Sequence, residues 1–370
     1  MFVFYEVLIQ MLGYRQLHNL QIDVEAVAPV TQKLDPVGFP LYRECKDTWY
    51  RADNVEVGQR EFIVLDPASY THSIHFRTET SAMTTKTAIV FAGGGSLGAV
   101  QVGMLRALVE TNVRFDMVIG ASVGAINGAY FAARPDSDGV QALAGFWRGL
   151  SKTDIFPLSW FDTCRGLIKR RGYLLQPSAL NRLLGQALPI HRIEDAVLPL
   201  YIVTTNLLSG AETVLSSGEL EQALLASAAI PLVFPCVQIA DQFLVDGGVA
   251  SNTPISTAVA LGATNVVVIP TGVSCDLTQP PRGLVALALH TVNLMSMRQL
   301  VSDIEHFRTV TSLHIVPPLC PVDVSVFNFD QTESLLQRAY EQTLRWLERG
   351  GLERTKVPGA LSIHSHAHEH

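Results

Sequence analysis

The sequence has few charged residues and no excess of positive charge. Lys and Arg number 27 against 34 Asp and Glu, so the net charge is −7, and 16% of the residues are charged. Nucleic-acid binding needs a positive field, so this balance argues against it. The 370 residues are 48% hydrophobic, which is enough for a large core and indicates that most of the chain is folded.

Cysteines are also few, and none of them forms a CxxC pair. The five are dispersed along the chain, at positions 45, 164, 236, 275 and 320. An odd, dispersed set is typical of free thiols in a reducing compartment rather than of a disulfide framework. We therefore expect a cytoplasmic protein.

Membrane and export signals are missing as well. The run from Ala223 to Ala240 carries no charge, but Pro231 and Pro235 interrupt it, so we expect a helix, a turn and a buried segment there. The first twelve residues are apolar but contain Glu6 and no basic residue, which is unlike a signal peptide. We expect neither a signal peptide nor a transmembrane helix.

Strands and helices alternate after Thr87. Two short apolar runs and two helical patterns follow one another, in the order Ala88–Ala92, Ala99–Glu110, Met117–Ile119 and Gly124–Ala133. This alternation predicts an α/β fold with a parallel sheet covered by helices. Later strands are predicted at Leu200–Thr205, Thr213–Ser216, Gln242–Val245, Asn265–Pro270 and Leu313–Val316, and later helices at Glu219–Ala229, Ile255–Leu261, Gly283–Arg308 and Gln331–Arg349.

A GxSxG motif follows the second apolar run directly, with Ser122 between Gly120 and Gly124. A nucleophilic serine must project from a sharp turn between a strand and a helix, and small neighbours permit that turn. The helix that follows directs its first amides towards negative charge that develops at the site. In this context the motif predicts a nucleophile elbow with Ser122 as the nucleophile.

Glycines also follow the first apolar run, at Gly93, Gly94, Gly95 and Gly98. Two interpretations compete. The spacing fits the GxGxxG fingerprint of dinucleotide binding, but that site needs an acidic residue at the end of the next strand, and this strand ends at Ser122. The alternative is an oxyanion hole, in which loop amides stabilise a tetrahedral intermediate. A serine at the end of the adjacent strand favours the oxyanion hole.

A carboxylate follows a later strand. Asp246 comes directly after the strand pattern Gln242–Val245, and Gly247 and Gly248 behind it allow a close approach to another backbone. By itself this is an ordinary Asp-Gly turn.

No histidine is suitably placed for a conventional triad. None of the internal candidates outside the N-terminal extension lies in a loop of small residues after a strand; they are His191, His290, His306 and His314. The absence of such a histidine, beside a well-placed aspartate, favours a dyad of Ser122 and Asp246.

Four sequence blocks occur in a fixed order. They are Gly93–Gly98, the GxSxG at Ser122, Ser227–Pro235, and Asp246-Gly247-Gly248 with Asn252 and Pro254. As an ordered set over about residues 87–260, they resemble the four blocks of the patatin-like phospholipases. The resemblance implies a mainly parallel central sheet flanked by helices on both faces. It also implies hydrolysis of lipid acyl esters by a Ser–Asp dyad without a metal or another cofactor.

Carried onto this chain, the resemblance implies that Ser122 is the nucleophile and Asp246 its base. The amides of the four loop glycines become the oxyanion-hole candidates. One position departs from the family pattern, because many members carry Arg or Lys before the last loop glycine, where this chain has Leu97. The backbone amides of the loop are present whichever residue stands at this position, so the departure does not exclude catalysis. It puts in doubt any help that the cation gives with a phosphate-bearing substrate.

The chain is thus interpreted in three parts. Residues 1–85 are an extension of unknown role, with a strand pattern at Glu61–Leu65 and no chemical motif. Residues 86–350 are the patatin-like catalytic domain, and residues 351–370 are a C-terminal tail with histidines at positions 364, 366, 368 and 370. These histidines would bind a metal only if the tail were extended, and a frayed terminus is the simpler interpretation.

An insertion between the motifs, Ser151–Pro199, combines apolar residues with the basic run Lys169-Arg170-Arg171. Such a segment near a lipase site can contact an anionic membrane surface. The alternative is a packed cap with a solvated edge. We expect a lipid or acyl ester substrate as the partner, and the sequence indicates no oligomeric state.

Three classes of function fit these residues. The first is a lipid acyl hydrolase. The second is an acyltransferase or thioesterase with the same dyad, which differs only in the acceptor. The third is a catalytically silent lipid-binding or regulatory protein, which the intact Ser122 and Asp246 argue against.

Overall fold

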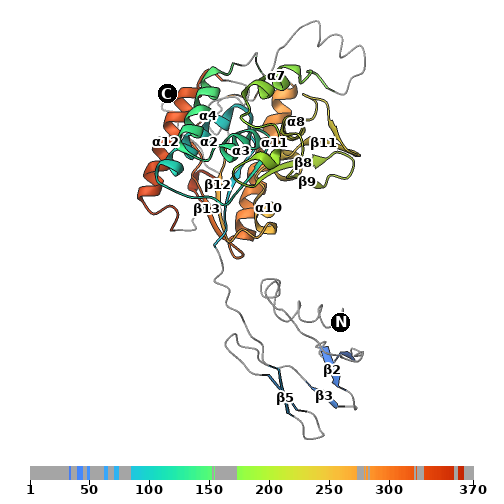
Figure 1. The fold of residues 1–370 in the computed structure, drawn as a ribbon. Helices are drawn as coiled ribbons and strands as arrows, with labels where there is room; N and C mark the ends of the chain where they lie inside the picture. Colours follow the sequence, from blue (N-terminus) through green and yellow to red (C-terminus); the bar gives the residue numbers. More distant parts are fainter. Residues whose placement is uncertain are drawn as a thin grey trace. The chain divides into compact units, whose positions relative to one another are not determined.

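The chain divides into two compact units, Met1–Thr84 and Thr85–His370 (Figure 1). The computed structural model describes residues 85–151, 154, 173–272, 279, 281, 284–320, 322, 329–353 and 357–361, and five short strands before residue 85. The insertion residues from Trp160 to Arg171 and the histidines of the C-terminal tail lie outside the described residues.

The first unit contains two small antiparallel sheets. One has the strand order β1 (Lys33–Leu34), β2 (Pro40–Glu44) and β3 (Thr48–Tyr50). The other is a hairpin of β4 (Phe62–Leu65) and β5 (Thr71–Ile74). β4 lies within the strand predicted at Glu61–Leu65.

The second unit is built on an eight-stranded sheet of order β10-β11-β8-β7-β6-β12-β13, with β9 paired to β8. The strands are β6 (Thr87–Phe91), β7 (Met117–Ala121), β8 (Leu200–Asn206), β9 (Glu212–Leu215), β10 (Val237–Ile239), β11 (Gln242–Asp246), β12 (Asn265–Ile269) and β13 (Ser312–Ile315). β8, β7, β6, β12 and β13 pair in parallel, whereas β9 and β11 each pair antiparallel with β8, and β10 pairs antiparallel with β11. The prediction of a mainly parallel central sheet is confirmed.

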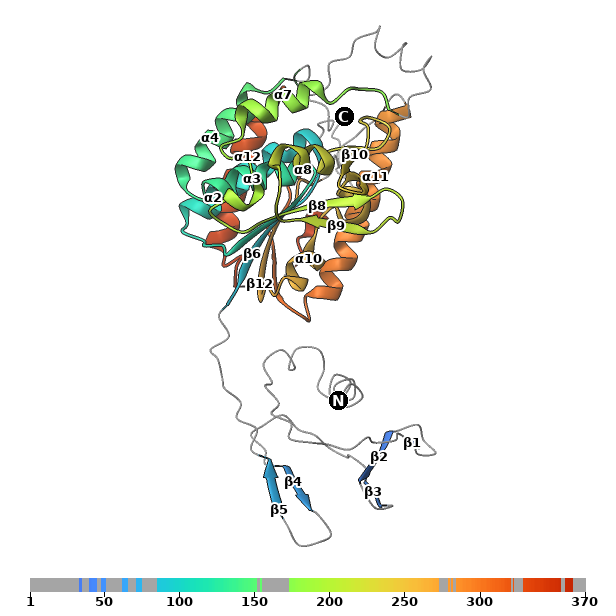
Figure 2. The same ribbon diagram turned by 45° about the vertical axis from the view of Figure 1, so that its right-hand side comes forward.

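Helices cover both faces of this sheet (Figure 2). On one face are α2 (Gly98–Glu110), α3 (Val123–Ala133), α4 (Ser137–Gly149), α7 (Ser178–Ala187), α8 (Leu220–Ser227) and α12 (Thr332–Glu348), and on the other are α10 (Ile255–Ala260) and α11 (Leu284–Phe307). Short helical turns complete the unit: η2 (Gly95–Leu97), η3 (Ile193–Asp195), α9 (Gly248–Ser251) and η4 (Gly359–Leu361). Among the described helices, none is both long and apolar enough to cross a membrane.

The sequence pattern of β6 explains why both faces are covered. Ile89 and Phe91 belong to the core under α2 and α3, whereas Ala88 and Val90 belong to the core under α10 and α11. Successive strand residues point to opposite faces, so a continuous apolar run needs a helix layer on each side.

The chain order of the strands places the site. From β6 the chain moves through β7 to β8 on one side, and then returns to β12 and β13 on the other side. Because strand–helix–strand crossovers are right-handed, this reversal puts the two sets of helices on opposite faces. Ligands of such sheets bind at the carboxyl ends of the strands next to the reversal. The glycine loop after β6 and Ser122 after β7 both lie at that edge.

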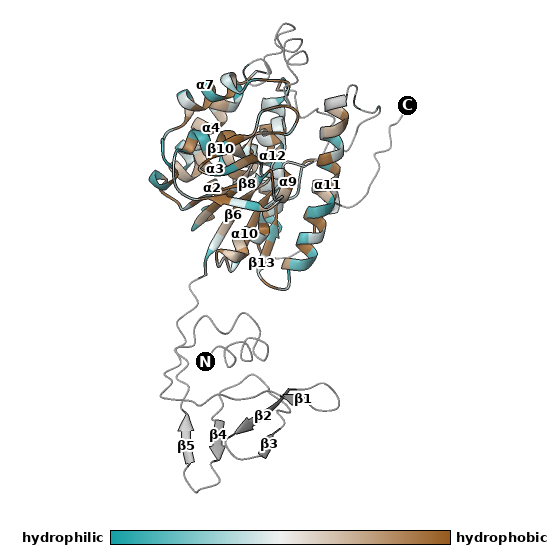
Figure 3. Ribbon diagram, turned by 90° about the vertical axis from the view of Figure 1, so that its right-hand side faces the viewer, coloured by the Kyte–Doolittle hydropathy of each residue, from teal (hydrophilic) through white to brown (hydrophobic). Residues whose placement is uncertain are grey.

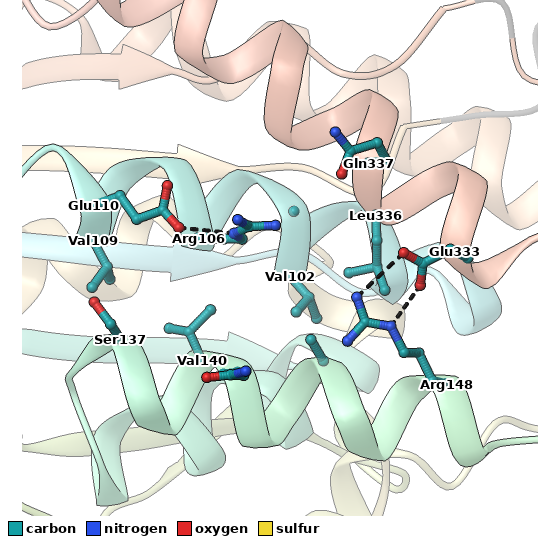
Figure 4. A pocket seen from close by; sticks show the side chains of 13 residues that line it. Val102, Arg106, Val109, Glu110, Ser137, Val140, Arg148, Glu333, Leu336 and Gln337 are labelled. Atoms are coloured by element: carbon teal, nitrogen blue, oxygen red, sulfur yellow. Dashed lines mark hydrogen bonds and ion pairs between the residues drawn. The ribbon is translucent and has the colours of Figure 1, made fainter.

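The outer helices α2, α4 and α12 enclose a cavity of about 270 Å³ (Figure 4). Two ion pairs lie in its wall: Arg106 and Glu110 at 2.8 Å, and Arg148 and Glu333 at 2.5 Å. Neither Ser122 nor Asp246 lines this cavity, and both guanidinium groups already have a carboxylate partner. The cavity is therefore part of the helix packing and separate from the site at the sheet edge.

The packing of α2 on α12 gives a prediction about stability. A side chain at Gly103 would meet the backbone carbonyl of Leu336 and would lie 2.9 Å from the Ala339 Cβ, so Gly103→Ala should lower the free energy of unfolding by about 1–3 kcal/mol. Gly145 on α4 has no neighbour within 4 Å of such a side chain, so Gly145→Ala should raise it by about 0.5–1 kcal/mol. Urea denaturation of both variants measures the difference, and equal effects would contradict this packing.

Candidate active site

Ser122 occupies a sharp turn between β7 and α3. Its backbone angles, φ 54° and ψ −128°, are unusual for a residue with a side chain, and its side chain is almost fully buried. A side chain at Gly124 would lie 2.5 Å from the carbonyl oxygens of Phe91 and Ala92, and one at Gly120 would lie 2.5 Å from the carbonyl oxygen of Gly124. The turn therefore requires glycine at both positions of the GxSxG motif.

A buried serine from α8 holds this turn in place. The Ser122 N–H donates to the Ser227 Oγ at 2.8 Å, and the Ser227 hydroxyl donates to the Val203 carbonyl at 2.7 Å. Ser227 is fully buried, so its hydroxyl links the strained backbone to β8 without access to water. The sequence showed Ser227 only as the first residue of a family block, and its hydrogen bonds depend on the fold.

Asp246 reaches Ser122 through an antiparallel strand. β11 pairs with β8 so that Asp246 lies opposite Thr204, at the edge where β7 ends. The Ser122 Oγ donates to the Asp246 Oδ2 at 2.6 Å, and the Gly248 N–H donates to the Asp246 Oδ1 at 2.7 Å. Both carboxylate oxygens are thus oriented, one by the serine and one by the backbone.

The two glycines after Asp246 are needed for this approach. A side chain at Gly247 would collide with the Val203 carbonyl, and one at Gly248 would lie 3.0 Å from the Asp246 Oδ1. The Thr205 hydroxyl also donates to the Asp246 carbonyl at 2.8 Å. The end of β11 is therefore closely packed against β8.

The environment of Asp246 favours its neutral form more than water does. Burial raises the pKa of Asp246 to about 6, although the hydrogen bonds from Ser122 and Gly248 act in the opposite direction. A carboxyl group with such a pKa is ionised at neutral pH and can also take up a proton readily. This is the property that a general base needs.

The glycine loop lies against Ser122. A side chain at Gly93 would lie 3.1 Å from the Ser122 Cβ. The Gly93 N–H donates to the Asn252 carbonyl at 2.9 Å, and the Gly93 carbonyl accepts from the Thr271 hydroxyl at 2.7 Å and from the Asn252 amide at 3.3 Å. Asn252 and Thr271 therefore fix the start of the loop beside the serine.

The loop amides differ in their hydrogen bonds. The Gly93 N–H is bonded to Asn252, and the Gly98 N–H donates to the Gly95 and Ser96 carbonyls inside the short helical turn. The N–H groups of Gly94 and Gly95 donate to no other residue in the described part of the chain. Gly95 also has φ 59°, a conformation that glycine adopts without strain.

A buried polar network supports the loop from below. The Gln101 amide donates to the Ala92 and Ile269 carbonyls at 2.8 and 2.9 Å, which joins the ends of β6 and β12. The Asn127 amide donates to Gln101 at 2.9 Å and to the Gly98 carbonyl at 3.0 Å, and the Trp147 indole N–H donates to Asn127 at 2.8 Å. None of these residues was predicted from the sequence, and the one local signal is Asn127, a lone amide in the small-residue helical pattern Gly124–Ala133.

Leu97 is fully buried in the core beneath α2. The position where many family members carry a cation is therefore part of the packing in this chain.

The described histidines form no hydrogen bond with Ser122 or Asp246. His314 lies on β13 at the edge of the sheet, where its Nε2 is 3.0 Å from the Ser312 hydroxyl and burial lowers its pKa. His290 and His306 lie on α11, and His191 is exposed. In the same described ranges, no three His, Cys, Asp or Glu side chains gather into a set that could hold a metal ion.

Comparisons with known proteins agree on one family. Residues 89–259 match the family described as Patatin-like phospholipase. A putative patatin-like phospholipase domain-containing protein of Caenorhabditis elegans is 32% identical over 192 residues, which are 51% of this chain and 17% of that protein. Patatin-like phospholipase domain-containing protein 7 of Mus musculus is 31% identical over 50% of this chain and 13% of its own length.

A lysophospholipase of Mycosarcoma maydis is 28% identical over 52% of this chain and 10% of its own length. The chain thus covers less than a fifth of each of these relatives, and the similarity concerns one domain of them. The residues of this chain that match the family, 89–259, include the elbow, the glycine loop and Asp246. The similarity of this chain to the patatin-like phospholipase family thus lies in residues 89–259.

Proposed function

We propose that this chain is a serine hydrolase that cleaves acyl ester bonds of lipids through the Ser122–Asp246 dyad. The observation that carries the proposal is the 2.6 Å hydrogen bond from the Ser122 Oγ to the Asp246 Oδ2 at the carboxyl edge of the sheet. The match of residues 89–259 to the patatin-like phospholipase family supports a lipid ester as the substrate, and the name of the Mycosarcoma maydis relative suggests a lysophospholipid.

In the first step, the Ser122 Oγ attacks the ester carbonyl carbon as its proton passes to the Asp246 Oδ2. The carbonyl oxygen becomes an oxyanion. When this tetrahedral intermediate collapses, the bond to the alcohol oxygen breaks, and Asp246 returns the proton to the leaving alcohol. An acyl ester on Ser122 remains.

In the second step, a water molecule attacks that acyl ester while Asp246 takes up one of its protons. The bond between the acyl carbon and the Ser122 Oγ breaks, and the proton returns to Ser122. The products are a free fatty acid and the original dyad. No histidine takes part in either step.

The oxyanion is stabilised by the N–H groups of Gly94 and Gly95. Both lack an acceptor among the described residues, and the loop that carries them lies beside Ser122. Gly93 and Gly98 were candidates from the sequence, but their N–H groups already donate to other carbonyls. We assign these two glycines to the shape of the loop. The first turn of α3 adds the positive end of its dipole.

The dyad gives a direct prediction for activity. Ser122→Ala and Asp246→Asn should each lower kcat/KM for a short p-nitrophenyl ester by at least about 10³-fold, because one removes the attacking oxygen and the other its base. His191→Ala, His290→Ala and His314→Ala should keep most of the activity, and EDTA should not inhibit. Circular dichroism of each variant controls for folding. A histidine variant as inactive as Ser122→Ala would show a triad instead of a dyad.

The raised pKa of Asp246 predicts opposite effects of pH on activity and stability. Activity should fall as pH drops below about 6, because a protonated Asp246 cannot accept the serine proton. For stability, the folded pKa lies above the unfolded one, so the folded state binds more protons between about pH 4 and 6 and loses stability as pH rises through this window. As pH rises through this window, the free energy of unfolding of the wild type should fall by up to about 3 kcal/mol relative to that of Asp246→Asn.

Urea denaturation of wild type and Asp246→Asn at several pH values measures this second effect. A stability difference that does not change between pH 4 and 7 would contradict the buried position of the carboxylate.

A further inference from the structure

Helix α11 is much longer than the strands that it covers. Its 24 residues measure about 36 Å, whereas the five-residue strand β12 measures about 17 Å. The helix follows β12 and precedes β13, so it starts on the side of the strands' carboxyl ends and runs back to their amino ends. Figure 3 shows it as a long rod beside the sheet.

The fully buried residues of α11 lie in its second half, and in its first half Met297 packs partly against the same core. Leu300 and Ile304 are buried against the sheet. Between residues 286 and 299, no described residue is fully buried. The first half of α11 therefore projects at the sheet edge that carries Ser122 and Asp246.

The outward face of α11 changes its chemistry at Arg298. Residues three or four apart lie on one face of a helix, and the exposed positions of α11 follow this spacing. In the second half they are Arg298, Ser302 and Glu305, as expected for a face in water. In the first half they include Leu287, Leu294 and Met295, which are exposed by 48, 47 and 66%.

The hydroxyl groups of the first half are bonded to the helix itself. The Thr291 hydroxyl donates to the Leu287 carbonyl at 2.9 Å, and the Ser296 hydroxyl donates to the Val292 carbonyl at 3.0 Å. There is no Asp, Glu, Lys or Arg from residue 284 to residue 297. This face therefore offers a partner neither charge nor these two hydroxyls, which matches the hydrocarbon of a lipid layer and not the polar rim of a protein interface.

A further exposed apolar side chain, outside α11, lies at the same edge. Val249 on α9 is 54% exposed and comes three residues after Asp246 in the chain. An apolar surface beside the dyad suits a substrate that is held in a lipid layer.

We propose that the first half of α11, residues 284–297, docks on the surface of a zwitterionic phospholipid layer and brings Ser122 to its substrate. This rests on the proposed lipid hydrolase function. The helix lies in the interface with its outward apolar face among the acyl chains, as amphipathic interfacial helices do. This docking differs from contact through Lys169–Arg171, because an uncharged face binds neutral lipid and is not screened by salt.

The test is flotation of the full chain with phosphatidylcholine vesicles in the Ser122→Ala background, which prevents lipid hydrolysis. The parent protein should bind, with less than about a twofold change between low and high salt. Met295→Glu and Leu294→Glu should each weaken binding at least about tenfold. Met295→Leu, which keeps an apolar side chain, should bind like the parent.

Val197→Glu is the matched control. Val197 is exposed by 66%, like Met295, but it precedes β8 and lies at the opposite edge of the sheet. This variant should bind vesicles like the parent. Separately, Met295→Glu with Ser122 intact should hydrolyse a short soluble ester at the wild-type rate.

Three outcomes would overturn the docking proposal. One is a parent protein that does not bind neutral vesicles, and another is equal binding by Met295→Glu and Val197→Glu. The third is a dimer in solution that Met295→Glu converts to a monomer, because a second copy would then cover this face. Failure of the wild-type protein to hydrolyse the soluble ester would instead count against the proposed hydrolase function. It would leave the flotation result intact.

Discussion

The buried hydrogen bond between Ser122 and Asp246 is the contact on which the rest of the site depends. It joins residues 124 positions apart, at a distance of 2.6 Å, and neither side chain is more than 7% exposed. To make it, the chain must return after β8 and insert β11 antiparallel beside it, with two glycines at its end. The sheet, the elbow and the β11 insertion are thus parts of one geometric solution.

The same contact has a cost that the surrounding structure offsets. Ser122 has a positive φ, and burial raises the pKa of Asp246, so both partners are in states that an isolated chain would avoid. Ser227 holds the serine backbone, and Gly248 donates to the carboxylate. Strain and burial of this kind are typical of residues that a fold has to position for chemistry.

The sequence predicted the parallel sheet because glycines and small residues separate the short apolar runs. The glycines of these turns also identified Ser122 and Asp246 as candidate site residues. Other features depend on contacts distant in sequence. The network of Gln101, Asn127 and Trp147 has no local spacing that reveals it. The sequence could not show which loop N–H groups are hydrogen-bonded within the chain, because the acceptor for the Gly93 N–H is the Asn252 carbonyl, 159 residues away. β10, a strand of only three residues between the third and fourth blocks, was not predicted either.

The central claim is that the Ser122 oxygen is a nucleophile activated by Asp246. The most direct measurement is peptide mapping by mass spectrometry after reaction with a fluorophosphonate, which reacts preferentially with activated serines. The account predicts a single adduct, on the peptide that contains Ser122, and none in Asp246→Asn. An adduct on a different residue, or equal labelling of Asp246→Asn, would contradict it.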